Sequence, residues 1–325
     1  MEMLHLNKRD IQNVGVTMSQ VLDAVGEGLR LKGLGKIQMP PRSAIRPLAD
    51  SFLDAMPVYI DDSKVCGVKW MSGYRGNRSK NLPYINGLLV LNDVATGMPV
   101  AVMDCAEITA IRTGAIVGIE AKYLAREDSS VVGILGCGVQ ARKSLVALMD
   151  VLPKLSLVRC YDIVPEAAAQ FVNEMEGLYP LTTFVICDSP EDMAHFADVV
   201  VTATPIVDKP KPSLHEGMLK EGALAIALDY DAAWGPSAMR ECDKIVADDV
   251  EQLLFTKQHG LHFQDIPEGI YSDLGDIVAG SKPGRQNSAE RILCLNLGIA
   301  VADVVAAKVL YDRARKHGIG RKLEL

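Results

Sequence analysis

The chain has 325 residues, which is long for one compact core, so we expect two domains. Hydrophobic residues make up 49% of the chain and charged residues 23%, and the scarcity of Trp and Phe predicts a mainly aliphatic core. The net charge of −7 and the lack of a long basic run argue against a nucleic-acid-binding surface.

The N-terminal half begins with a helix and continues as β structure. Thr17 to Gln20 has the spacing of a capping box, and apolar residues then recur at helical spacing. Three β segments follow without intervening helices, at 51–60, 65–71 and 85–91. We therefore expect hairpins in a mostly antiparallel sheet, closed by a helix over about 107–125.

The second half alternates between strands and helices. Apolar strands are predicted at 129–135, 157–161, 184–187, 199–203, 224–228 and 244–247, and helices at about 140–149 and 165–175. This alternation is typical of a parallel, doubly wound sheet. A last helix, about 299–316, is expected to return to the first domain. The expected fold is α/β: a doubly wound domain at 126–298 and a discontinuous α+β domain formed by residues 1–125 and 299–325.

A Gly-rich turn lies between the first strand and the first helix of the doubly wound domain. Residues 136–141 read GCGVQA, which fits the dinucleotide fingerprint G-x-G-x-x-G/A in the context that it requires. Gly136 would allow the tight turn, and Gly138 would let the backbone approach a pyrophosphate. The free N–H groups at Val139 and Gln140 would face the phosphates. An ordinary strand-to-helix turn is the alternative.

Asp162 ends the next strand, somewhat beyond the usual spacing of about 20 residues from the Gly-rich turn. A carboxylate at this position suits the ribose hydroxyls and repels a 2′-phosphate, so NAD is favoured over NADP. Thr202 and Thr204 follow a later strand, where such a sheet contacts the rest of the nucleotide; alternatively, they form only a strand end before a Pro turn.

Four segments together carry a resemblance to a known family: 102–104 (VMD), 109–115 (TAIRTGA), 121–125 (AKYLA) and 136–141 (GCGVQA). In this order they resemble the ornithine cyclodeaminase/mu-crystallin family, which also contains an archaeal-type alanine dehydrogenase and several ketimine and imino-acid reductases. The resemblance extends from 39–42 to 296–298. It implies a substrate-binding and dimerisation domain around a Rossmann domain, a homodimer, and cofactor contacts from Thr113 and Asn296.

Three cations match family residues that grip the substrate carboxylate: Arg42, Lys69 and Arg112. An arginine offers a planar fork for a carboxylate, and a lysine offers a point charge that can also act as acid or base. Lys69 lies within the apolar stretch 66–71, so its charge requires a partner. The alternative is that these residues form structural salt bridges, and Arg46 could replace Arg42.

Two acids match the family as well. Asp231 is predicted to hold the substrate amino group or to move its protons, and Asp54 matches a second acidic position of the cyclodeaminases. Either could equally be a strand-end or turn residue, and Asp229 competes with Asp231. The chain departs from the family pattern at 228–235 and at Tyr84, a bulky residue that we expect to reshape the substrate pocket.

Three functions are compatible with these residues. The first is NAD(H)-dependent oxidation of a small amino acid or reduction of its imine, with Arg42, Lys69 and Arg112 fixing the carboxylate and Lys69 or Asp231 managing protons. The second is ornithine cyclodeamination, which releases ammonia with catalytic NAD and must hold a second amine through Asp54 or Asp231. The third is a non-catalytic, nucleotide-bound ligand-binding protein of mu-crystallin type.

Other features predict a cytoplasmic protein without metal or membrane partners. His259 and His262 lack neighbouring ligands in the sequence and are interpreted as solvated loop residues. The N-terminus is charged, unlike a signal peptide, and no apolar stretch reaches the length of about 18 residues needed for a membrane span. Seven scattered cysteines without a Cys-x-x-Cys pair predict free thiols in a reducing compartment.

Overall fold

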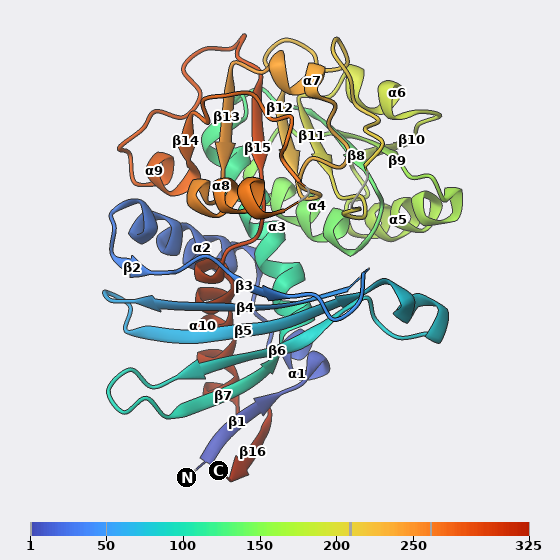
Figure 1. Ribbon diagram of the computed structural model, residues 1–325. Helices are drawn as coiled ribbons and strands as arrows, with labels where there is room; N and C mark the ends of the chain where they lie inside the picture. Colours follow the sequence, from blue (N-terminus) through green and yellow to red (C-terminus); the bar gives the residue numbers. More distant parts are fainter. Residues whose placement is uncertain (1, 50, 208–209, 261, 325) are drawn as a thin grey trace. The chain divides into compact units, whose positions relative to one another are not determined.

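The computed structural model describes residues 2–49, 51–207, 210–260 and 262–324. The chain divides into two compact units: a discontinuous unit of residues 1–112 and 299–325, and a continuous unit of residues 113–298 (Figure 1). The first division falls between Arg112 and Thr113, inside helix α3 (Cys105–Leu124), whereas the sequence placed it after residue 125. A helix that continues across the division leaves no turn signal in the sequence.

The discontinuous unit contains an eight-stranded sheet in the order β16-β1-β7-β6-β5-β4-β2, with β3 also paired to β4. The strands β4 to β7 pair antiparallel with their chain neighbours, which confirms the predicted hairpins. The bounds are β1 (Glu2–Leu6), β2 (Ile37–Gln38), β3 (Ser43–Ile45), β4 (Ser51–Ile60), β5 (Val65–Tyr74), β6 (Ile85–Asn92), β7 (Pro99–Asp104) and β16 (Arg321–Glu324). A 3-10 turn, η1 (Arg75–Lys80), precedes β6.

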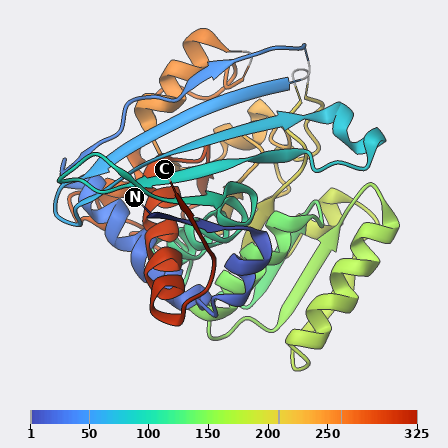
Figure 2. The same ribbon diagram turned by 90° about the horizontal axis from the view of Figure 1, so that it is seen from below.

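Helices cover one face of this sheet. Helix α10 (Ala300–His317) packs against β4, β5 and β6, and α2 (Met18–Gly33) packs beside α10 (Figure 2). A Cβ added at Gly28 would lie 3.0 Å from Val301, so the missing side chain lets the two helices approach closely. The predicted capping box at Thr17 is present, and α10 ends at Gly318 with φ +66°. The short α1 (Lys8–Asn13) also contacts α10.

The continuous unit is built on a parallel sheet in the order β10-β9-β8-β11-β12-β15-β13-β14. The strand order reverses between β8 and β11, and right-handed crossovers then place helices on opposite faces. The α/β class and the doubly wound sheet are confirmed. The strands are β8 (Val131–Leu135), β9 (Leu157–Tyr161), β10 (Thr183–Ile186), β11 (Val199–Thr202), β12 (Leu224–Ala227), β13 (Lys244–Ala247), β14 (Ser272–Asp273) and β15 (Ile292–Leu295).

The helices of this unit are α4 (Val139–Val151), α5 (Pro165–Leu178), α6 (Pro190–His195), α7 (Pro236–Arg240), α8 (Val250–His259) and α9 (Leu274–Val278). Within the parts of the chain that the structure describes, none of the helices has the length and apolar character needed to cross a membrane. All seven cysteines are free thiols, as the sequence predicted.

Candidate functional site

The Gly-rich turn lies at the carboxyl end of β8, beside the end of β11. Gly136 has φ +88°, and a Cβ there would lie 2.7 Å from the carbonyl oxygen of Ala203, so a side chain is excluded by both backbone conformation and space. A Cβ at Gly138 would meet no atom within 4 Å. Gly138 is also the N-cap of α4, and it makes no side-chain hydrogen bond to the first N–H groups of that helix. This geometry fits a bound pyrophosphate.

Gln140, in the first turn of α4, has a buried Oε1 without a hydrogen-bond partner among the described residues. Asp162 fixes the neighbouring loop: its Oδ2 accepts the N–H of Cys137 at 2.8 Å, and its Oδ1 accepts the N–H of Val164 at 2.9 Å. Each carboxylate oxygen keeps a further lone pair, which is what two ribose hydroxyls require. Asp162 is therefore positioned by the protein and still able to accept hydrogen bonds from a ligand.

The end of β11 is organised by Asp229. Its carboxylate accepts hydrogen bonds from the hydroxyl of Thr202 at 2.6 Å and from the N–H and hydroxyl of Thr204 at 3.1 and 2.5 Å. Trp234 donates in turn to the Thr202 hydroxyl, and burial raises the pKa of Asp229. Thr202 and Asp229 are both 0% exposed, so they hold the two strand ends together. Thr204, half-buried, is the residue of this group that remains within reach of solvent.

Asn296 follows β15 and is held by Glu120 of α3. Its Nδ2 donates to the two carboxylate oxygens at 3.0 and 3.3 Å, and its Oδ1 has no hydrogen-bond partner among the described residues. Burial raises the pKa of Glu120 to about 8. The amide oxygen of Asn296 is thus an available acceptor, suited to an N–H donor such as a carboxamide. Thr113 is buried on α3, 8% exposed.

Lys69 lies in the middle of β5 on the face covered by α10. Its register partners on the neighbouring strands are Met56 and Leu89, so an ammonium group stands in an otherwise apolar row. Its Nζ lies 2.7 Å from Oδ2 of Asp303 on α10, and the Nε of Arg112 donates to Oδ1 of the same carboxylate at 2.8 Å. The discontinuous unit therefore contains a buried cluster of two cations around one carboxylate.

The interior strongly affects the ionisation of this cluster. Burial lowers the pKa of Lys69 to about 8, while Asp303 acts to raise that pKa and Arg112 to lower it. Burial also raises the pKa of the neighbouring Cys105 thiol to about 12. At neutral pH the lysine is charged but close to titration, and the thiol is neutral.

The other predicted site residues of this unit also have defined partners. Arg42 pairs with Asp54 of β4 through Nη1 and Oδ2 at 3.2 Å, and both side chains are largely buried. Tyr84 is half-buried in the turn before β6, and its carbonyl accepts the N–H of Tyr74. This ion pair is compatible with the structural salt bridge considered as an alternative, and the roles of Arg42 and Asp54 in substrate binding stay predictions.

Asp231 also has defined partners. Its Oδ2 accepts the N–H of Phe263 at 2.6 Å, and its Oδ1 lies 3.0 Å from Nδ1 of His262. The interpretation of His262 as a solvated loop residue is wrong: it is 8% exposed and stacks edge-on against Tyr230. Asp231 is less enclosed than Asp229 and faces a side chain that can exchange protons, so between the two it is the better candidate for proton transfer.

Comparison with known proteins shows the family to which this chain belongs. Residues 3–318 match the ornithine cyclodeaminase/mu-crystallin family. The chain belongs to this family. It is 36% identical to the alanine dehydrogenase of Archaeoglobus fulgidus over 338 residues, covering 100% of this chain and 99% of that protein. The resemblance seen in the sequence is confirmed.

Solved structures of family members share the fold. The Δ1-pyrroline-2-carboxylate reductase of Thermococcus litoralis, in complex with NADH and L-proline, has a TM-score of 0.90 and 32% identity, with 98% of this chain and 99% of that chain covered. An archaeal alanine dehydrogenase dimer with bound NAD has a TM-score of 0.87 and 33% identity, with both chains covered in full.

The sequence analysis missed Asp303 and Glu120, and it misinterpreted His262. Each is a buried polar group whose partner is distant in the sequence, and Asp303 contacts Lys69 across more than two hundred residues. One signal was available for Asp303: a lysine in an apolar strand requires an anion, and Asp303 is the acid in the first turn of the last helix.

Proposed function

We propose that this protein is an NAD(H)-dependent oxidoreductase that acts on the C–N bond at the α-carbon of a small amino acid or of the corresponding imine. The convergence of Lys69 and Arg112 on one buried point carries this proposal, because two cations in an apolar interior form a receptor for a substrate carboxylate. Two family members compared above, the alanine dehydrogenase and the pyrroline-2-carboxylate reductase, are named for this type of chemistry.

The continuous unit would hold the cofactor. Gly136 and Gly138 leave space for the pyrophosphate, Asp162 would accept the ribose hydroxyls and disfavour NADP, and Asn296 would accept from the carboxamide. The remaining predicted contacts, from Thr113, Val139, Gln140, Thr202 and Thr204, belong to the same proposal. When bound, NAD accepts a hydride from the substrate, and NADH returns one.

The chain's own residues bind, orient and exchange protons. Arg112 would fix the carboxylate, while Lys69, with a pKa lowered by burial to about 8, can donate or accept a proton near neutral pH. Asp231, backed by His262, would hold the amino group and take its proton. The role of Arg42 as a third carboxylate ligand would require it to leave Asp54 or to bind both carboxylates.

Turnover assays distinguish this function from the two alternatives. Purified protein is incubated with NAD and a panel of amino acids, and separately with NADH and cyclic imines or with ammonia and 2-oxo acids. Net change in NADH absorbance is expected. Ammonia release with catalytic NAD would instead identify a cyclodeaminase. Cofactor binding without any turnover would identify a ligand-binding protein and contradict the proposal.

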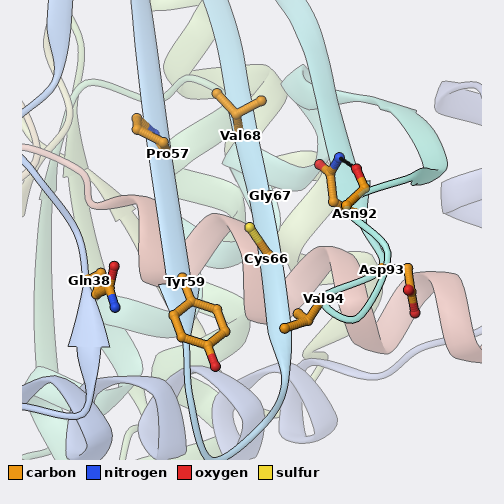
Figure 3. A pocket seen from close by; sticks show the side chains of 10 residues that line it. Gln38, Pro57, Tyr59, Cys66, Gly67, Val68, Asn92, Asp93 and Val94 are labelled. Atoms are coloured by element: carbon orange, nitrogen blue, oxygen red, sulfur yellow. Dashed lines mark hydrogen bonds between the residues drawn. The ribbon is translucent and has the colours of Figure 1, made fainter.

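We also propose a homodimer, formed through the face of the discontinuous unit's sheet that lies opposite α10. A wholly apolar row on this face is formed by the register partners Pro57, Val68, Val90 and Val102. Trp70 and Leu88 pair beside it and are 43% and 48% exposed. Figure 3 shows this face, with Pro57 and Val68 at the edge of a groove of about 600 Å³. Exposed apolar surface of this kind marks association sites, and an alanine dehydrogenase of similar structure is a dimer.

Light scattering on a sizing column tests the dimer. The wild-type protein is expected at twice its chain mass of 35.2 kDa, and Leu88→Arg is expected near the mass of one chain. Leu181→Arg is the control, because Leu181 is 98% exposed on the continuous unit. A monomeric wild type, or a dimer that Leu88→Arg leaves intact, would contradict the assignment. The cytoplasmic location stays a prediction.

A further inference from the structure

Asp303 occupies the centre of the two-cation cluster. It projects from the first turn of α10, whereas Lys69 comes from β5 and Arg112 from α3. The side chains of Lys69 and Asp303 are 0% exposed and that of Arg112 is 7% exposed. Each Asp303 oxygen takes one cation, Oδ2 the ammonium and Oδ1 the Nε of the guanidinium. One carboxylate therefore holds two side chains from two other elements.

The cluster leaves hydrogen-bond donors without partners. Among the described residues, Lys69 and Arg112 each have one hydrogen-bond or ion-pair partner, and for both it is Asp303. An ammonium has three N–H groups and a guanidinium five, so most of these donors are unfilled. The two terminal amino groups of Arg112 form a planar fork that fits a second carboxylate.

The net charge of the cluster also favours the binding of an anion. Two cations and one carboxylate leave a net positive charge on side chains that are almost entirely buried. Such a charge is costly unless an anion joins it. The cluster neither balances its charges nor fills its hydrogen-bond donors.

We propose that Asp303 is a positioning residue of the carboxylate site: it aims the free N–H groups of Lys69 and Arg112 at the substrate carboxylate and leaves one net positive charge to receive it. This inference rests on the proposed function and adds to it the residue that orients the two cations. Asp303 does not contact the reacting bond and acts through its two partners.

Removing the Asp303 charge should change how binding depends on pH. The titratable or charged groups facing Lys69 are Asp303 on α10 and Arg112 and Cys105 on α3, and the neighbouring strands present Met56 and Leu89. Burial raises the pKa of the Cys105 thiol to about 12, so this thiol is neutral over the pH range of the test. Without Asp303, the ammonium loses its stabilising anion and deprotonates at lower pH.

The test uses NADH-loaded protein and two probes of the same shape, pyrrole-2-carboxylate and pyrrole-2-carboxamide. Calorimetry gives the affinity of each probe from pH 6.5 to 9.5 for wild type and Asp303→Asn. We expect Asp303→Asn to weaken carboxylate binding at pH 7 by about tenfold while changing carboxamide binding little. The pH at which carboxylate binding is lost should fall by at least about one unit.

Two further variants keep the test decisive. Asp312→Asn is the matched control, because Asp312 lies on the same helix, is 53% exposed in its side chain and pairs only with Lys308 among the described residues. If Asp303→Asn does not fold, Asp303→Glu keeps the charge and displaces it by one methylene. Asp303→Glu should leave unchanged the pH at which carboxylate binding is half lost, and it should weaken that binding. Wild-type affinity in this variant would overturn the positioning role.

Two other results would count against the inference, and a third separates it from the proposed function. If Asp303→Asn weakens the binding of both probes equally, Asp303 has a structural role only. If carboxylate binding is unchanged or tighter, and is half lost at an unchanged pH, Asp303 merely competes with ligands. Either result overturns the inference. If wild type prefers the carboxylate but turns over no amino or imino acid, the proposed function fails while the role of Asp303 stands.

Discussion

The two sheets of this protein place their functional groups in different positions. In the discontinuous unit, Lys69 lies at mid-strand on the helix-covered face of an antiparallel sheet. In the continuous unit, polar groups gather at the carboxyl ends of parallel strands, at Gly136, Asp162 and Asp229. A parallel sheet is buried on both faces, so its ligands are bound at strand ends. An antiparallel sheet with one covered face can bury a charge in its centre, provided that the covering helix supplies the counter-ion.

The largest expected effect tests the mid-strand cation. Replacing Lys69 with Met removes the ammonium but preserves an unbranched chain among Met56 and Leu89. Because a positioned acid or base contributes about a hundredfold to ten-thousandfold, we expect amino-acid turnover to fall by about a thousandfold. NADH binding, followed by fluorescence, should be unchanged. Lys36→Met, at an exposed lysine paired with Asp62, is the control. Retained turnover in Lys69→Met would remove Lys69 from the site.

The next effect tests the strand-end site with two glycines. Gly136→Ala puts a Cβ against Ala203 at φ +88° and should cost about 1–3 kcal/mol of unfolding free energy as well as NADH affinity. Gly138→Ala meets no protein atom, so it should weaken NADH binding at unchanged thermal stability. Thermal unfolding and NADH titration of both variants check this difference. Equal stability losses would show that Gly138 serves the fold and not the cofactor.

A smaller effect concerns cofactor choice. Asp162→Asn keeps one oxygen for the N–H of Cys137 but removes the negative charge. We expect the ratio of kcat/KM for NAD to kcat/KM for NADP to fall by about tenfold, because a 2′-phosphate is no longer repelled. An unchanged ratio would place the ribose away from Asp162.

The last effect is on stability and not on activity, and it concerns Glu120, whose pKa is raised by burial to about 8. The folded state binds this proton more tightly than the unfolded state, so stability falls as pH rises from about 4.5 to about 8. Glu120→Gln cannot ionise, and it should gain stability relative to wild type over this window, by roughly 1.4 kcal/mol per pKa unit at most. Urea unfolding at pH 5 and pH 8.5 measures the difference. A pH-independent difference would contradict the burial of an ionisable Glu120.

The contrast between the sheets also explains which features the sequence could predict. The turn at residues 136–141 is a local motif between a strand and a helix, so its position could be read directly, while its contact with the cofactor stays a prediction. The strands at 51–60 and 157–161 were predicted with their observed bounds, because apolar runs between turn residues are local signals. The four-residue apolar strand β15 is a signal of the same kind and was overlooked.

Long-range partners could not be predicted in this way. Lys69 was identified from its apolar surroundings and from the family resemblance, but its pairing with Asp303 depends on how α10 returns to the sheet. The choice between Asp229 and Asp231 likewise depended on the hydrogen bonds from Thr202 and Thr204, which occupy Asp229. Strand β1 was missed because a short strand at the chain terminus is stabilised by its partners, β7 and β16, and not by its own sequence.

A crystal structure of the wild-type protein with NAD and an amino acid that the turnover assays identify as a substrate tests the central claim most directly. The substrate carboxylate is predicted to accept hydrogen bonds from Lys69 Nζ and from the terminal amino groups of Arg112, with Asp303 still bound to both cations. A carboxylate bound elsewhere, beside an unchanged Lys69–Asp303–Arg112 cluster, would contradict the account.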